Sequence, residues 1–95
     1  MALSIADQSS ATNGTIAPTT IAGQIPGVGY PARLFVSVSS NDVTFLTGTS
    51  GSGALEVAVG SKAVFINDFE ADTPVNVRSD SGTASVKYSW LRLAR

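Results

Sequence analysis

The clearest pattern along the chain is an alternation of apolar and polar positions that begins at residue 34. Leu34, Val36 and Val38 occupy every second position of residues 34–40. Successive side chains of a β-strand point to opposite faces, so this spacing predicts a strand with one apolar face. Short apolar runs of the same kind predict further strands at residues 43–47, 55–59, 62–66, 75–78 and 84–93.

The segments between these runs are rich in turn residues. Asn41-Asp42 predicts a tight turn into residues 43–47, and residues 79–83 predict a hairpin into the last strand. Residues 62–66 are apolar on both faces, which predicts a central strand. Strands that recur about every 8–12 residues are typical of sandwiches and barrels. We therefore expect an all-β fold, a small antiparallel β-sandwich or barrel-like domain.

Residues 1–33 differ from the rest of the chain. They hold three of the four prolines, and Asp7 and Arg33 are their only charged residues. Proline and glycine at this density oppose a long helix. The segment is apolar and nearly uncharged, whereas disordered tails are usually charged. We expect an extended N-terminal arm at residues 1–33 that orders against a partner, and a β domain at residues 34–95; a tail without fixed structure is the alternative.

The candidate partner-binding residues share an apolar character or a place near a terminus. They are Ile5, Ile16, Ile21 and Ile25 in the arm, and Leu91, Leu93 and Arg95 at the C-terminus.

Composition narrows the function classes. Charged residues make up 14% of the chain, the net charge is −1, and the sequence contains neither His nor Cys. A nucleic-acid-binding protein would show a basic excess, and common zinc sites need His or Cys. Catalysis by general acids and bases most often uses His. We therefore expect no enzyme activity, no cofactor, no metal, no nucleic acid and no membrane partner. A small domain without disulfides usually gains stability by association, which predicts a homo-oligomer.

Two further clusters each have two interpretations. Asp68, Glu70 and Asp72 would share one side of an extended backbone and could bind calcium; we favour a solvated acidic turn, because calcium needs six or more oxygens. The Gly-Ser segment at residues 48–53 lacks the lysine and the following helix of a phosphate-binding loop, so we expect a connection between strands.

The last predicted strand carries an aromatic pair. Tyr88 and Trp90 share a face with Arg92, and an exposed trio could stack on sugars or bases. We favour burial of Tyr88 and Trp90 in the core, since so small a domain needs its largest side chains inside. Leu91 and Leu93 would then meet a neighbour on the other face.

The stretch from Asp72 to Arg78, with residues 81–84 and the run from Ser89 to Leu93, resembles small bacteriophage capsid decoration (cement) proteins and related virion accessory proteins. The resemblance implies a β domain, often trimeric, that sits on the capsid shell and latches onto coat subunits by an extended arm.

Our leading hypothesis is a structural virion protein that stabilises a phage capsid by bridging coat subunits. Its partner would be the major capsid protein. It would be made in the host cytoplasm and act at the capsid surface as a homo-oligomer, with a trimer favoured. The alternatives are a head-tail or tail accessory protein and a small carbohydrate- or host-surface-binding module. On the leading hypothesis, deletion of residues 1–25 should abolish particle binding and leave the β domain folded.

Overall fold

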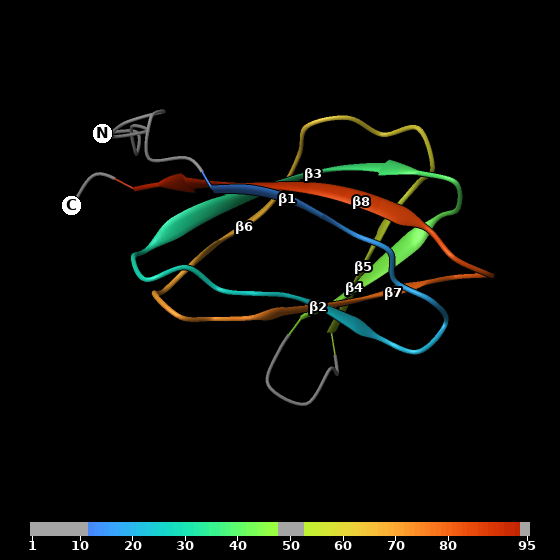
Figure 1. Ribbon diagram of the computed structural model, residues 1–95, viewed down its shortest axis with the longest axis horizontal. Helices are drawn as coiled ribbons and strands as arrows, with labels where there is room; N and C mark the ends of the chain where they lie inside the picture. The colour runs from blue at the N-terminus through green and yellow to red at the C-terminus, as the bar shows by residue number, and fades with distance from the viewer. Residues whose placement is uncertain (1–11, 48–52, 94–95) are drawn as a thin grey trace.

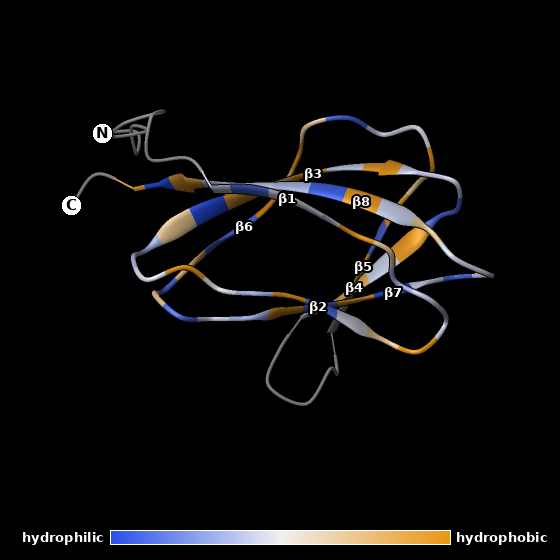
Figure 2. Ribbon diagram, viewed as in Figure 1, coloured by the Kyte–Doolittle hydropathy of each residue, from blue (hydrophilic) through white to orange (hydrophobic). Residues whose placement is uncertain are grey.

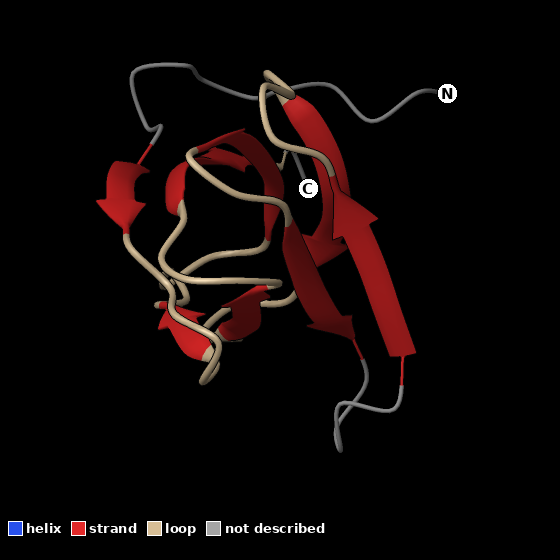
Figure 3. Ribbon diagram, turned by 90° about the vertical axis from the view of Figure 1, so that its right-hand side faces the viewer, coloured by secondary structure: helices blue, strands red, loops and turns tan. Residues whose placement is uncertain are grey.

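The computed structural model describes residues 12–47 and 53–93, which form two packed antiparallel sheets (Figure 1). The described strands are β1 (Thr12–Ile16), β2 (Gly23–Ile25), β3 (Ala32–Ser39), β4 (Val43–Thr47), β5 (Gly53–Val57), β6 (Val64–Phe69), β7 (Val75–Ser79) and β8 (Ser85–Arg92). Only strands and loops occur in this part of the chain (Figure 3). The predicted all-β sandwich is confirmed.

The chain passes from one sheet to the other at almost every connection. The first sheet has the order β1-β8-β3-β6 and the second has the order β2-β7-β4-β5. Among the described strands that follow one another in the sequence, only β4 and β5 are neighbours in one sheet. The hairpin predicted at residues 79–83 is therefore wrong, because this loop bridges the two layers, and the chain likewise changes sheet after the tight turn predicted at Asn41-Asp42. Ser40 and Gly82 adopt φ angles of 78° and 61°, left-handed conformations that help these short loops turn.

Strand β6 is an edge strand of the first sheet, and the prediction of a central strand at residues 62–66 is wrong. β6 pairs with β3 alone among the described strands, and a bulge interrupts this pairing at Leu34/Phe35. Phe65 is 48% exposed on the outer face. The apolar residues on that face of β6 therefore reflect an aromatic contact at the surface rather than burial between two layers.

The described part of the predicted arm belongs to the β domain. All five residues of β1 pair with β8, from Thr12 opposite Trp90 to Ile16 opposite Val86. β2 pairs with β7 in the other sheet. The predicted boundary between residues 33 and 34 falls inside β3. Proline and glycine separate these short strands without preventing them, and residues 1–11 of the predicted arm lie outside the described residues.

The core lies between the inner faces of the two sheets. The alternating burial of β3 places Leu34, Val36 and Val38 inside, as their spacing predicted. Figure 2 shows hydrophobic (orange) segments on strands of both sheets. The buried cluster consists of Ile25, Ala32, Leu34, Val36, Val38, Val43, Phe45, Val57, Ile66, Val75, Val77, Ala84, Val86 and Trp90.

Candidate functional site

The outer face of the first sheet carries an aromatic patch, which we define as Arg33, Phe35, Phe65 and Leu91. The rings of Phe35 and Phe65 have centroids 5.9 Å apart and are tilted by 55°. The Arg33 guanidinium carbon lies 5.3 Å from the centre of the Phe65 ring. Aromatic residues, phenylalanine included, and arginine are enriched at protein interfaces, so this patch is the leading candidate for a binding surface.

Strand register brings the four side chains together. Phe35 of β3 lies opposite Phe65 of β6, and Arg33 lies opposite Leu91 of β8. Because inner residues of β3 alternate with outer ones, the burial of Leu34 and Val36 forces Arg33 and Phe35 outward. The patch therefore depends on three strands that are far apart in the sequence.

Arg33 is held in place by Asp68 at the edge of the patch. Its Nε donates a hydrogen bond to Asp68 Oδ1 at 2.7 Å, and its Nη2 donates to Oδ2 at 3.1 Å. The hydrogen bond to Asp68 raises the pKa of Arg33 further above its ordinary value, so the guanidinium is charged at any working pH. This two-point contact fixes the plane of the guanidinium beside the Phe65 ring.

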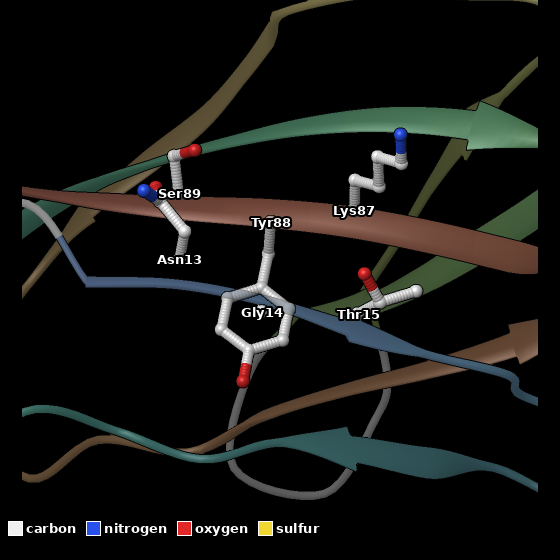
Figure 4. A pocket seen from close by; sticks show the side chains of 6 residues that line it. All are labelled: Asn13, Gly14, Thr15, Lys87, Tyr88 and Ser89. Carbon is white, nitrogen blue, oxygen red and sulfur yellow. The ribbon is translucent and has the colours of Figure 1, made fainter.

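A polar depression of about 390 Å³ lies on the same face, over β1 and β8 (Figure 4). Asn13, Thr15, Lys87 and Ser89 point to one side of the two strands, whereas Tyr88 points to the other. The depression is floored by the paired backbone at Gly14 and Tyr88. Hydroxyl, amide and ammonium groups thus border the aromatic patch.

The outer face of the second sheet is different in character. Gln24 Nε2 donates to Asn76 Oδ1 at 3.1 Å, and Thr44 Oγ1 donates to Asp80 Oδ1 at 2.6 Å. Each of these bonds joins two polar side chains. The contrast between the two faces makes the first sheet the candidate interaction surface.

The structure distributes the predicted partner-binding residues over several environments. Ile5 and Arg95 lie outside the described residues. Ile21 is 82% exposed in the loop before β2, and Leu91 is part of the aromatic patch.

The remaining predicted partner-binding residues belong to the domain interior. Ile25 is fully buried in the core, and Ile16 is partly buried against it. Leu93 is 3% exposed, and its N–H donates to the carbonyl of Pro31 at 3.0 Å. Ile25 and Leu93 therefore lack the exposed surface that contact with a partner requires, because both side chains are already buried in the free domain.

Tyr88 and Trp90, the aromatic pair of the last strand, are buried to different degrees. Trp90 is 1% exposed, as the burial interpretation predicted, and its ring packs edge-on against Phe69 with centroids 5.6 Å apart. Tyr88 is half-buried against the core. Arg92 lies over the ring of Tyr30, 5.0 Å from its centre. The three side chains do not form an exposed stacking surface.

The acidic residues do not line up as one row. Asp68 lies in β6 and binds Arg33, while Asp72 occupies a turn with a φ of 60°. The turn breaks the extended backbone that would place the three carboxylates on one side. No group of three potential metal-ligating residues occurs among the residues that the structure describes. The Gly-Ser segment lies outside the described residues apart from Gly53.

Sequence reasoning missed Phe35 and Phe65 as functional candidates. The available signal was Phe35 itself, a large aromatic residue that shares its face of residues 34–40 with Ser37 and Ser39. The apolar run at residues 62–66 obscured Phe65, because its two-sided pattern predicted burial.

Comparison with models of protein families, with curated proteins and with solved structures finds no match to this chain. Within residues 12–47 and 53–93, no helix is long and apolar enough to cross a membrane.

Proposed function

We propose that this protein is a structural virion protein that stabilises a phage capsid by bridging coat subunits. The observation that carries the proposal is the aromatic patch on one face of a small sandwich whose other face carries hydrogen-bonded polar side chains. The resemblance of residues 72–93 to capsid decoration proteins supports the choice of partner.

The patch has the chemistry of a protein interface. Phe65 offers a half-exposed ring whose orientation is set by Phe35 and Arg33, so little side-chain freedom is lost on binding. Burial of apolar surface contributes about 25 cal/mol per Å². A coat subunit with a complementary apolar surface would thus gain affinity from a preorganised contact.

A second contact with the capsid could come from residues 1–11, because Thr12 lies at the end of the sandwich nearest the aromatic patch. Thr12 lies opposite Trp90, and Ala32 lies opposite both Phe69 and Arg92, so these strand ends meet at one place. The patch residues Arg33 and Leu91 pair next to that end. Residues 1–11, which include Ile5, precede Thr12, and a patch and a segment that bind two coat subunits would reinforce each other by multivalency.

Co-sedimentation with capsid shells tests the proposal. The shells are assembled from the coat protein of the virus that encodes this chain, and they are incubated with the wild-type protein or with Phe65→Ser. We expect the wild type to sediment with the shells and to raise the temperature at which they come apart. Phe65→Ser should lose most of the binding and remain folded, since substitutions at half-exposed positions usually cost little stability.

Arg78→Ala is the matched control, because Arg78 is exposed on the outer face of the second sheet. It should bind shells like the wild type. If Phe65→Ser binds shells as strongly as the wild type, the aromatic patch does not contribute to shell binding. A wild-type protein that ignores shells but sediments with tails or connectors would instead support the accessory role.

We also propose that the protein self-associates, with a trimer as the favoured state. The motivation is the small size of the domain and its low net charge of −1, which opposes association only weakly. Light scattering of the purified protein measures its mass directly. A monomer at all concentrations would refute the oligomer and leave the docking proposal in place.

A further inference from the structure

Both lysines of the sequence line one surface depression. Lys62 and Lys87 border a hollow of about 200 Å³ on the outer face of the first sheet, which we call the lysine depression. Its other lining residues are Ser37, Val38, Ser39, Gly60 and Ser61. The two lysines of the sequence therefore lie at the same depression, although one belongs to β8 and the other to the loop before β6.

The backbone around the lysine depression is hydrogen-bonded on both sides of β3, to β8 and to the loop before β6. Lys87 of β8 lies directly opposite Ser37 of β3. Lys62 belongs to the loop before β6, which is bound to the end of β3: Gly60 N donates to Val38 O at 2.8 Å, and Val38 N donates to Ser61 O at 2.9 Å. These backbone hydrogen bonds fix the position of the loop beside the end of β3. The shape of the hollow is therefore set by the fold.

Several of the residues that line the hollow carry hydrogen-bond donors. Each lysine ammonium offers three N–H donors and no acceptor. Ser37 Oγ accepts a hydrogen bond from Ala63 N at 3.0 Å, so its own proton remains available to donate. Ser39 and Ser61 add two more hydroxyls, and neither Asp nor Glu is among the lining residues. Such a site favours an anion that can accept many hydrogen bonds.

We propose that the lysine depression binds a tetrahedral oxyanion, a phosphate or a sulfate group. Its volume lies below the range of about 300–1,000 Å³ that holds whole drug-sized ligands, so it suits one small group. A tetrahedral oxyanion presents more acceptor oxygens than a carboxylate, so it can use more of the donors that the two lysines and three serines of the lining offer. The inference stands apart from the proposed capsid docking, which rests on the aromatic patch.

An NMR titration of the full-length protein tests the site. Inorganic phosphate, inorganic sulfate and glucose 6-phosphate are each added at constant ionic strength, with chloride as the balancing ion. We expect saturable shifts of the backbone amides of Val38, Gly60, Ser61, Lys62 and Lys87. Equal affinity for phosphate and its sugar ester would indicate a site for the free ion, and tighter binding of the ester would indicate a group carried on a larger molecule.

Charge-matched variants decide whether the two lysines carry the binding. Lys62→Gln and Lys87→Gln should each weaken it by roughly two- to five-fold, the range of exposed charge pairs. Lys87→Arg should retain it, and Arg78→Gln, which changes the net charge equally on the other sheet, should leave it unchanged. Linear shifts without saturation, or equal losses in Arg78→Gln and the lysine variants, would overturn the proposal. Unchanged amide shifts outside the depression verify that each variant is folded.

Discussion

The indole Nε1 of Trp90 donates a hydrogen bond to the backbone carbonyl of Pro26 at 3.1 Å. Trp90 lies in β8 of the first sheet, and Pro26 directly follows β2 of the second. The Trp90 side chain therefore packs in the core and also holds, through its hydrogen bond to Pro26, the segment that crosses from β2 to the first sheet.

Trp90→Phe should destabilise the domain by about 2 kcal/mol, because it removes the donor to Pro26 and leaves unfilled space beside Phe69. The melting temperature of so small a domain falls by about 4–8 °C for each kcal/mol lost. Denaturant and thermal unfolding measure the change. Phe65→Leu on the exposed patch is the control and should change stability by about 0.5 kcal/mol or less. Equal losses in the two variants would contradict the role assigned to Trp90.

Tryptophan fluorescence reports Trp90 alone, since the sequence has one tryptophan. We expect blue-shifted emission that resists quenching by iodide, because the indole is 1% exposed. Sugars and calcium should leave the spectrum unchanged. A red-shifted, readily quenched emission from the folded protein would restore the carbohydrate-binding hypothesis that relied on an exposed indole.

Gly14→Ala should destabilise the pairing of β1 with β8. A Cβ at Gly14 would overlap with the hydroxyl and ring of Tyr88, which crosses β1 at this position. We expect a loss of about 1–3 kcal/mol, the usual cost of overpacking. A double-mutant cycle gives the test: in a Tyr88→Ala background the same Gly14→Ala change should cost far less. An unchanged cost in that background would mean that the ring is not the obstacle.

Gly27→Ala and Gly29→Ala form a matched pair in the loop between β2 and β3. A Cβ at Gly27 would lie 2.6 Å from the backbone nitrogen of Thr73, whereas at Gly29 nothing lies within 4 Å. Gly27→Ala should cost about 1–3 kcal/mol. Gly29→Ala should be neutral or stabilising by up to about 1 kcal/mol, since it restricts the unfolded chain. Chemical unfolding of the two variants provides the comparison, and similar midpoints would refute it.

Two truncations distinguish a role of the N-terminal segment in binding from its role in folding. Deletion of residues 1–25 removes β1 and β2 and the fully buried Ile25, so we expect the domain to unfold, in contrast to the expectation from sequence. Deletion of residues 1–11 removes neither strand and should leave the fold intact. Circular dichroism and amide chemical-shift dispersion distinguish the outcomes. Only the shorter deletion can test whether the N-terminal segment contributes to shell binding.

The strands that follow residue 33, and the inward face of β3, could be predicted from the sequence, whereas β1 and β2 lie in the segment predicted as an extended arm. Leu34, Val36 and Val38 lie inside because their alternation matches the two-residue repeat of a strand, and this repeat depends on neighbouring residues alone. The burial of Trp90 was also predictable, since a small domain has few large side chains with which to fill its core.

Strand order could not be predicted in the same way. The turn signals at Asn41-Asp42 and residues 79–83 are local and are compatible with either a hairpin or a crossing between layers. Which of the two forms depends on how all the apolar faces are buried together, and that is a property of the whole chain.

The candidate sites belong to this second category. The sequence by itself determined that Phe35 and Lys87 lie on strands and which residues alternate with them. Only the tertiary structure decided that Phe35 meets Phe65, that Arg33 binds Asp68, and that Lys62 and Lys87 share one depression. The physical reason is that alternation is set by adjacent residues, whereas these contacts join distant segments and require the register of β3 with β6 and β8.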